Sequence, residues 1–368
     1  MRHTSTLLTA LLLASLASLS AADDVTRIEL GPIETVLPDN ALGLRYFPDG
    51  RLAVVRTKPD CRVIAAVGVC SFLLEGPAMG KFTKATKVLE KGKPGDFDNG
   101  YAGINAVVRS RTGELLAFCH SEDQEGMASV GNGIPGFYCR VALAVSTDDG
   151  ATFIKRGPVL AGQTQKNPKG SPDQGVGEPW VLTGDQDEYL FAYYTSHERA
   201  NGRGVDICLA RCRMADALRP EAWQKFHAGS FNEPGLGGKD TPVVTGGYNE
   251  TDALFPQVVF IPALRQYVMM FCLNAWRESG KPERSGIYAA LSNDGIHWPR
   301  EQMRQIWRVP VIAGIGGEVA WHPTLVLDAD SATHGFLYCG YSENWGGQPP
   351  HKPHYLIRRR IGIVGEHP

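Results

Sequence analysis

Residues 175–199 read GVGEPWVLTGDQDEYLFAYYTSHER, and this stretch is the clearest copy of the pattern that predicts the fold of the chain. A Gly-rich loop leads into a short apolar strand, which is followed by a turn and by a second strand rich in aromatic residues. The next stretch, GVDICLARCRMADALRPEAWQKF at 204–226, supplies a third strand. These short strands in succession form one supersecondary unit.

The same unit recurs five times along the chain. Its copies lie at 40–58 with 70–89, 101–123 with 136–157, 175–199 with 204–226, 251–276 with 285–301, and 318–345 with 354–365. A sustained helical period is missing, and 214–226 is the only fair helical candidate. Short strands repeating at about 69 residues predict an all-β, five-bladed β-propeller, with four-stranded antiparallel blades around a central channel. One or two long β-sandwiches are the rival interpretation.

Composition excludes several classes of protein. The chain has 368 residues, and 37 Lys and Arg against 39 Asp and Glu give a net charge of −2. A near-neutral chain without a basic block has no electrostatic footprint for nucleic acid. The 42 Gly and 24 Pro suit a chain that turns often.

The N-terminus reads as a secretory signal peptide over residues 1–22. Arg2 and His3 precede an apolar stretch at 7–19, and small residues at 20–22 offer a cleavage site. A membrane anchor is the alternative, but about 13 apolar residues are fewer than the roughly 20 that span a bilayer. We therefore expect a single mature domain over 23–368, secreted or periplasmic, without a membrane segment.

Eight cysteines fit an oxidising compartment. Cys61 and Cys70 close a short loop and form the best candidate disulfide. Cys119 and Cys139 lie on strands that we expect to be neighbours, which makes a second disulfide plausible. Cys208 and Cys212 lie within one strand and lack a second pair at zinc-site spacing.

Two sequence motifs predict the turns of outer hairpins. Residues 146–153 have the form S-x-D-x-G-x-T-F, and residues 292–298 the form S-x-D-G-x-x-W. Ser and Asp bond the local backbone, Gly supplies the positive φ, and the aromatic residue packs between sheets. The first turn resembles the Asp-box of sialidases. The second resembles the turn in five-bladed propeller glycosidases similar to glycoside hydrolase family 43 and its relatives in families 32, 117 and 130.

Inner strands of a propeller converge on the channel, so the residues that enter them are the catalytic candidates. Alignment of the units puts Asn40, Asn105, Glu178, Phe255 and His322 at equivalent inner positions, and Pro follows the last three. An X-Pro step is expected to hold residue X extended. In the family resembled, an Asp-Pro pair at this place often carries a catalytic carboxylate, and Glu178-Pro179 is the nearest match here.

Glycoside hydrolysis uses two carboxyl groups, one as acid and one as base or nucleophile. We expect Glu178 and Glu318 to form this pair, because each follows a Gly-rich approach and has Trp180 or Trp321 nearby. Asp98 or Asp252 is the expected pKa modulator or substitute.

Polar and aromatic residues also end the second strands, as in CHSED, TSHER, LNAW and SENW. A sugar site needs hydroxyl partners and flat apolar faces. The residues predicted to contact substrate are Asn105, His120, Trp180, His197, Arg199, Asp252, Trp276, Trp321, His322, Glu343 and Trp345.

The sequence thus predicts a secreted glycoside hydrolase that acts on an oligo- or polysaccharide. A non-catalytic carbohydrate-binding propeller, a sialidase-like hydrolase and a polysaccharide lyase remain as alternatives. We expect no cofactor. The alternative is a Ca²⁺ ion in the channel near His120, His197 and His322, as a central histidine implies in some members of the family resembled.

Overall fold

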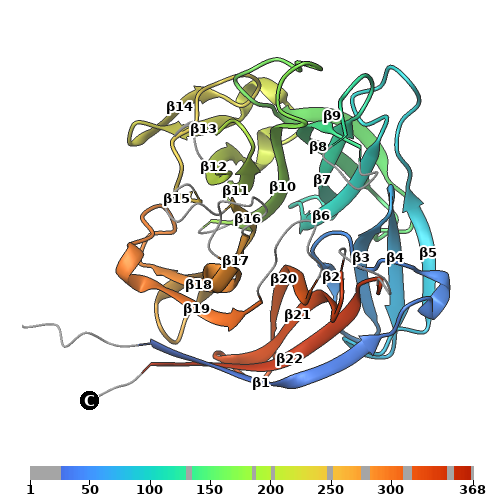
Figure 1. Cartoon of the computed structure of the whole chain (residues 1–368), viewed down its shortest axis with the longest axis vertical. Helices are drawn as coiled ribbons and strands as arrows, with labels where there is room; N and C mark the ends of the chain where they lie inside the picture. Colours follow the sequence, from blue (N-terminus) through green and yellow to red (C-terminus); the bar gives the residue numbers. More distant parts are fainter. Residues whose placement is uncertain are drawn as a thin grey trace, which may run out of the picture.

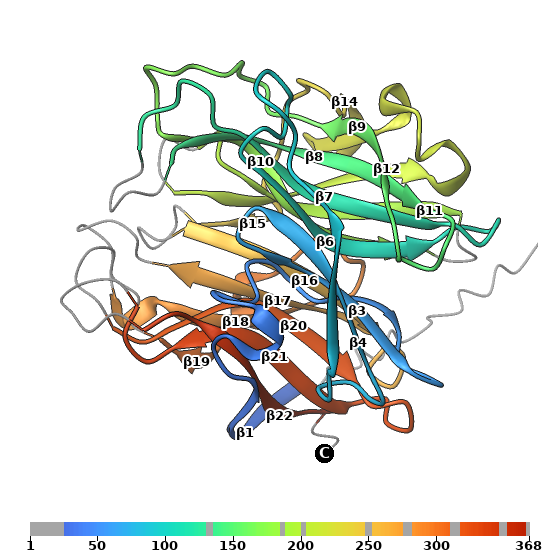
Figure 2. The ribbon, with the colours of Figure 1, turned by 90° about the vertical axis from the view of Figure 1, so that its right-hand side faces the viewer.

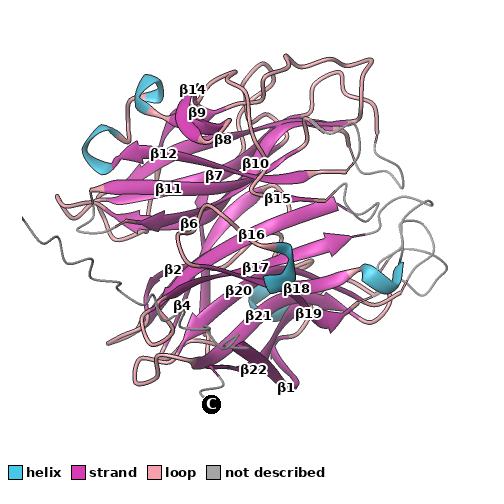
Figure 3. Ribbon diagram, turned by 90° about the vertical axis from the view of Figure 1, so that its left-hand side faces the viewer, coloured by secondary structure: helices cyan, strands magenta, loops and turns pink. Residues whose placement is uncertain are grey.

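We describe the protein from a computed structural model. The structure describes residues 26–129, 135–184, 188–199, 204–246, 252–274, 282–309, 317–345 and 352–365. The predicted signal peptide, residues 1–22, and the predicted contact residue Trp276 lie outside these ranges. Figure 3 shows strands throughout the molecule and only short helical turns. The described part of the chain is therefore all-β, as predicted.

The helical turns are each three residues long. They are η1 (Ala41–Gly43), η3 (Met214–Asp216), η4 (Pro220–Ala222), η6 (Pro282–Arg284) and η7 (Arg300–Gln302). The helical candidate at 214–226 is therefore two 3-10 turns followed by the start of a strand.

Residues 53–245 form three antiparallel meanders. The first contains β2 (Ala53–Arg56), β3 (Cys61–Val67), β4 (Cys70–Gly76) and β5 (Lys84–Leu89). The second contains β6 (Tyr101–Arg109), β7 (Leu115–Asp123), β8 (Phe137–Ser146) and β9 (Ile154–Leu160). The third contains β10 (Asp173–Thr183), β11 (Tyr189–Ser196), β12 (Asp206–Arg213), β13 (Gln224–His227), β14 (Ser230–Pro234) and β15 (Val244–Thr245). A short parallel pairing of β10 with β8 joins the second and third meanders into one continuous sheet.

Two further four-stranded sheets follow. One contains β16 (Asp252–Ile261), β17 (Gln266–Asn274), β18 (Gly286–Ser292) and β19 (Met303–Arg308). The other contains β20 (Val319–Leu327), β21 (His334–Ser342), β22 (Tyr355–Gly365) and β1 (Thr26–Leu37). The N-terminal strand β1 thus pairs antiparallel with the C-terminal strand β22, as Figure 2 shows beside the C-terminus. Our assignment of units from the sequence left this strand out.

The first strands of the meanders lie innermost. Figure 1 shows the meanders in chain order around a common centre, with β2, β6, β10, β16 and β20 nearest to it. Neighbouring first strands contact each other from β2 through β20. Leu52, directly before β2, donates a hydrogen bond from its backbone nitrogen to Thr324 Oγ1 on β20, at 3.0 Å. The last sheet is therefore joined to the first.

Apolar side chains fill the space between successive sheets. The described residues form five buried clusters, and each lies between two neighbouring meanders. Tyr338 and Leu356 of the last sheet, for example, pack with Val63 and Leu74 of the first. Alternating side chains of twisted sheets produce these interfaces because both faces of each sheet are covered.

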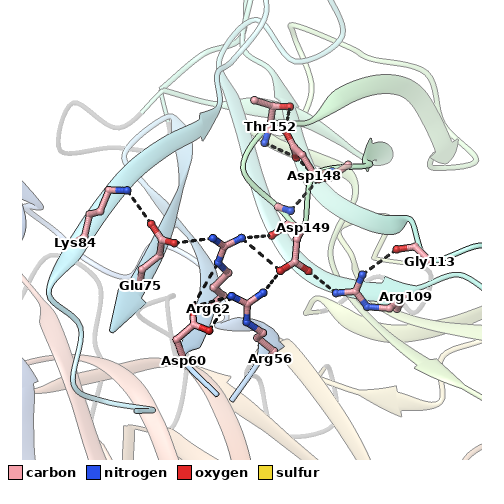
Figure 4. Close-up of polar contacts among 12 residues, drawn as sticks. Arg56, Asp60, Arg62, Glu75, Lys84, Arg109, Gly113, Asp148, Asp149 and Thr152 are labelled. Carbon is pink, nitrogen blue, oxygen red and sulfur yellow. Dashed lines mark hydrogen bonds and ion pairs between the residues drawn. The ribbon is translucent and has the colours of Figure 1, made fainter. Parts of the chain in front are cut away.

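The two predicted hairpin turns make the local bonds expected of them. Ser146 Oγ accepts the backbone N–H of Gly150 at 2.9 Å, and Ser292 Oγ accepts that of Gly295 at 2.9 Å. Gly150 and Gly295 have φ of 87° and 73°. Figure 4 shows that Asp149 of the first turn also contacts Arg56, Arg62 and Arg109, and Arg56 and Arg62 belong to the first meander. The turn thus joins two neighbouring meanders.

Both predicted disulfides are wrong, because all eight cysteines are free. On the β3–β4 ladder Cys70 faces Val67 beside the turn, whereas Cys61 faces Gly76 at the open end. On the β7–β8 ladder Cys119 faces Ala142, three residues from Cys139. An offset of three residues places two side chains on opposite faces of a sheet and about 10 Å apart, beyond the reach of a disulfide.

Candidate active site

Four innermost strands carry a β-bulge at matching places. The ladder shifts register around Asn105 in β6, Glu178 in β10, Phe255 in β16 and His322 in β20. The predicted alignment of these four residues therefore agrees with the structure. Their predicted extended backbone does not, because Glu178, Phe255 and His322 have φ of 51°, 59° and 55°. A bulge inserts one extra residue and re-aims its side chain, and left-handed residues other than glycine cluster at functional sites.

The first meander departs from the predicted alignment. Asn40 is exposed and precedes η1, so its assignment to an innermost position is wrong. The residues just before β2 take that place instead. Arg51 donates a hydrogen bond from its backbone nitrogen to Asn105 Oδ1 at 3.1 Å, and its Nη2 donates to the backbone oxygens of Glu178 and Pro179.

Asp49 is the acidic residue of this centre that sequence reasoning missed. Its side chain is 39% exposed, and its Oδ1 lies 4.0 Å from Nε2 of His322. Burial among the surrounding residues, together with the charges of Glu122 and Glu178, raises the pKa of Asp49 to about 7. The sequence carried a signal for this position, because the turn pair Asp49-Gly50 and then Arg51 precede the apolar run LAVV at 52–55.

Glu178 is fixed by neighbours from three other segments. Its backbone nitrogen donates to His120 Nδ1 at 3.1 Å, and its Oε2 accepts a hydrogen bond from Thr195 Oγ1 at 3.1 Å. Its backbone oxygen accepts from Arg51, as above. The histidine and the arginine thus fix the backbone of Glu178 at the bulge, and Thr195 orients its carboxylate.

His120 connects two of the acids. Its Nε2 lies 2.9 Å from Glu122 Oε1, and Gln124 Nε2 donates to Glu122 Oε2 at 2.6 Å. Because Nδ1 accepts the N–H of Glu178, the ring proton lies on Nε2 and points to Glu122. Burial lowers the pKa of His120, but the bond to Glu122 and the charges of Glu122, Glu178 and Asp49 outweigh it and raise that pKa. A second ring proton would displace the Glu178 N–H bond.

A buried cation lies beneath these acids. The side chain of Arg51 is fully buried, and its Nε and Nη1 have no hydrogen-bond partner among the described residues. Burial lowers its pKa to about 10, while the charge of Glu178 raises it. The ring of His322 lies 4.1 Å from that of Phe255, and burial together with the charge of Arg51 holds its pKa well below the usual value. His322 is therefore neutral at neutral pH.

Two predicted contact residues form a second polar group close by. Asp173 Oδ2 lies 3.3 Å from His197 Nδ1 and 2.5 Å from Arg199 Nη2. Burial opposes its charge, but these two partners outweigh burial and hold the pKa of Asp173 below its usual value. The ring of Phe137 links this group to the centre, with centroids 6.1 Å from His120 and 5.4 Å from His197.

Three predicted acids have partners outside the Asp49 group. Glu318 Oε1 accepts a hydrogen bond from Tyr341 Oη at 3.0 Å. Asp98 forms an ion pair with Lys155. Asp252 Oδ1 accepts the N–H of Val205 at 2.8 Å. The acids whose charges act on Asp49 are Glu122 and Glu178, so the structure groups Glu178 with Asp49 rather than with Glu318.

The predicted aromatic contacts fall into two places. Trp180 Nε1 donates to the backbone oxygen of Val258 at 2.7 Å, and the ring packs between the third and fourth meanders. Trp321 and Trp345 contact each other, with ring centroids 5.1 Å apart. Glu343 accepts a hydrogen bond from Tyr355 Oη at 2.8 Å.

Two of the histidines that we considered for a metal ion have protein partners. Both ring nitrogens of His120 have protein partners, and Nδ1 of His197 faces Asp173. Among the residues that the structure describes, no group of three or more His, Cys, Asp or Glu is placed to hold a metal ion. In the same part of the chain, no helix has the length and apolar character to cross a membrane.

The arrangement is suited to acid and base chemistry. Asp49, Glu122 and Glu178 lie close enough for their charges to interact, and one of them holds a proton near neutral pH. A carboxyl group that donates a proton beside one that accepts a proton is the pair that acetal hydrolysis requires.

Comparison with known proteins finds solved structures with a similar fold. No protein-family model matches the sequence, and a search of curated proteins finds no match. Solved structures do match over nearly the whole chain. A thermostable family-43 glycoside hydrolase is 13% identical with a TM-score of 0.51, covering 86% of this chain and 89% of that one.

Two arabinan-related enzymes are similar to the same extent. The α-L-arabinanase of Penicillium chrysogenum complexed with arabinobiose is 12% identical, with a TM-score of 0.53, covering 91% of this chain and 100% of that one. The α-L-arabinofuranosidase of Lactobacillus brevis is 10% identical, with a TM-score of 0.57 and coverages of 88% and 92%. The structure thus resembles family-43 and related glycoside hydrolases, and the likeness concerns the fold.

Proposed function

We propose that this chain is a secreted glycoside hydrolase built on a five-bladed β-propeller. The contacts among the five first strands, the bond from Leu52 to Thr324 and the apolar cluster between the last and first sheets all support a closed ring of blades. Residues 23–368 form the single mature domain in this proposal. Secretion rests on the N-terminal stretch, and seven of the eight cysteines are buried, which protects them in an oxidising compartment.

One observation carries the proposed activity. Asp49 and Glu178 are 129 residues apart in the sequence, yet their charges interact beside the innermost strands, where Asp49 has a pKa of about 7 and keeps 39% of its side chain exposed. One of the two protonates the oxygen of the leaving sugar, and the other removes a proton from the attacking water or attacks the anomeric carbon itself. Thr195 orients Glu178, and His120 ties the backbone of Glu178 to Glu122.

Arg51 lies beside Glu178. Its guanidinium donates to the backbone carbonyls of Glu178 and Pro179, so a buried positive charge stands next to this acid. Burial, together with the charges of Glu122 and Glu178, raises the pKa of Asp49 to about 7, so Asp49 is the member of the pair that keeps its proton near neutral pH.

The similar structures suggest where to start with substrates. Two of them are named as an arabinanase and an arabinofuranosidase. We therefore propose an oligo- or polysaccharide substrate and put arabinan and 4-nitrophenyl α-L-arabinofuranoside first in a panel of plant and algal polysaccharides and aryl glycosides. His197, Arg199 and Asn105 are proposed to contact or position the sugar. The proposal includes no cofactor.

The test compares three variants on the substrate found in this panel. Asp49→Asn and Glu178→Gln each remove one carboxyl group without changing shape, and we expect kcat to fall by about 10² to 10⁴. Glu318→Gln is the matched control, because Glu318 is bonded to Tyr341. Full activity in Asp49→Asn would exclude this pair. Loss in Glu318→Gln with full activity in Asp49→Asn would restore the pair expected from the sequence.

The same variants assign the two roles. A variant that lacks the acid keeps its activity on glycosides with good leaving groups, such as 2,4-dinitrophenyl glycosides, because these need no protonation. A variant that lacks the base or nucleophile stays slow on them, and added azide restores its turnover. Absence of turnover across the whole panel, with sugar binding retained, would support the carbohydrate-binding alternative instead.

A further inference from the structure

Four rings from separate segments form an aromatic cluster next to the catalytic pair. Tyr46 and Trp345 contact edge to face, with ring centroids 5.6 Å apart. His354 lies 5.2 Å from Trp345 and 5.9 Å from Tyr46, and Trp321 lies 5.1 Å from Trp345. We call Tyr46, Trp321, Trp345 and His354 the aromatic cluster. Its members come from the loop before β2, from β20, and from the segments after β21 and before β22.

Backbone connections place the cluster beside Asp49. His354 Nε2 lies 3.0 Å from the backbone oxygen of Pro48, the residue before Asp49. Trp321 precedes His322, whose Nε2 lies 4.0 Å from Asp49 Oδ1. Tyr46 is three residues before Asp49 in the same loop. A sugar bound by the aromatic cluster would therefore lie next to the sugar that Asp49 contacts.

Part of the cluster is held open to solvent. Trp321 and His354 are 7% and 3% exposed and form its buried base, whereas Tyr46 is 38% exposed. Tyr46 has a φ of 57°, a conformation that is uncommon for a bulky residue. A fold that needs Tyr46 only for its core would bury the ring. The structure instead keeps a costly backbone conformation that leaves the ring partly exposed, which is typical of binding sites.

A polar group borders these rings. Glu343 lies two residues before Trp345 and accepts hydrogen bonds from Tyr355 Oη at 2.8 Å and Lys352 Nζ at 3.4 Å. Burial opposes its charge, but these partners outweigh burial and lower the pKa of Glu343, so it is ionised at neutral pH. Aromatic surface beside a fixed acceptor matches a sugar, which has an apolar C–H face and hydroxyl donors at its edge.

We propose that the aromatic cluster binds a second sugar unit of the substrate, adjacent to the unit whose bond Asp49 and Glu178 cleave. Tyr46 stacks on the apolar face of this unit, Trp345, whose ring stands at 85° to that of Tyr46, packs against the edge of the unit, and Glu343 accepts a bond from one of its hydroxyl groups. The inference rests on the proposed function and narrows it to chains of at least two neutral sugars.

The experiment measures KM and kcat on an arabinan-derived tetrasaccharide, or on the tetrasaccharide of the sugar that the panel identifies. We expect Tyr46→Ala and Trp345→Ala to raise KM about tenfold and to change kcat less than about twofold, because binding is lost and chemistry is kept. Tyr46→Phe keeps the ring and should keep KM. Phe260→Ala is the matched control, because Phe260 is 42% exposed and lies at the far end of β16 from Asp252.

A second readout does not depend on turnover. In the Glu178→Gln background, the tetrasaccharide should shift tryptophan fluorescence, and Trp345→Phe should reduce that shift. Circular dichroism and thermal unfolding confirm that each variant is folded. Turnover with an unchanged KM in both Tyr46→Ala and Trp345→Ala would overturn this inference and leave the proposed function standing. An inactive wild-type chain that still shows the fluorescence shift would overturn the hydrolase and leave the subsite standing.

Discussion

At the scale of single residues, the protonation state of each acid in the candidate site depends on its burial and on the charged groups around it. Burial, together with the charges of Glu122 and Glu178, raises the pKa of Asp49 to about 7, so its proton is retained to about that pH. Asp173 has His197 and Arg199 as partners and is ionised throughout the neutral range. An aspartate thus has a raised pKa at position 49 and a lowered pKa at position 173, because the neighbouring groups differ.

The raised pKa of Asp49 predicts how the stability of the folded chain depends on pH. Its pKa is higher in the folded chain than the value of about 3.9 in an unfolded chain. A raised pKa means that stability is full at acidic pH and is lost as pH rises through about 7. Asp49→Asn should therefore melt at a higher temperature than the wild type at pH 8, and the difference should shrink toward pH 4.

Differential scanning fluorimetry of both proteins from pH 4 to pH 8 measures this. The exposed turn residue Asp330 serves as the control, and Asp330→Asn should follow the wild type at every pH. A difference between Asp49→Asn and the wild type that stays constant across this range would contradict the assigned environment of Asp49.

At the scale of elements, hairpin turns join neighbouring meanders. Asp149 lies in the β8–β9 turn with a φ of 59°, and its carboxylate contacts Arg56, Arg62 and Arg109 (Figure 4). The motif at 146–153 correctly predicted the turn and its local bonds. It could not predict the arginines, because they come from strands about 40 to 90 residues earlier in the chain.

Removal of the Asp149 charge should weaken this junction. Asp149→Asn keeps a residue that tolerates left-handed backbone, but it leaves three arginines facing one another without their shared partner. We expect the free energy of unfolding to fall by about 1 to 2 kcal/mol, with a smaller loss at high salt because the arginines are then screened.

Urea titrations at low and high salt measure the effect. Asp216→Asn removes a surface acid that pairs only with Arg219 in an exposed turn, and it should change stability little. Equal losses in the two variants would show that the Asp149 cluster contributes no more than an ordinary surface ion pair.

At the scale of the whole molecule, the two ends of the chain share one sheet. β1 forms nine residue pairs with β22 and becomes the outer strand of the sheet that β20 begins. The sequence units began at residue 40 and missed this strand, because an outer strand far from its partners carries no copy of the repeated pattern. The terminal pairing is thus a product of the tertiary fold.

A chain that begins at Pro38 tests this closure against one that begins at Thr26. Loss of β1 removes a ladder of backbone hydrogen bonds worth roughly 0.5 to 1.5 kcal/mol each, so unfolding should require several kcal/mol less. A synthetic peptide of residues 26–37 added in excess should restore part of the melting temperature. Identical melting curves for the two chains would show that β1 contributes nothing to closure.

The amino-acid sequence alone predicts the strands of the repeated units, the outer turns and the alignment of Asn105, Glu178, Phe255 and His322. These features follow from local alternation of apolar residues and from turn residues, which each segment carries in its own sequence. The tertiary structure alone decided the partner of Glu178, the free state of the cysteines and the pairing of β1 with β22. Asp49 lies 129 residues from Glu178 in the chain, and only the assembly of meanders around one centre places the two acids where their charges interact.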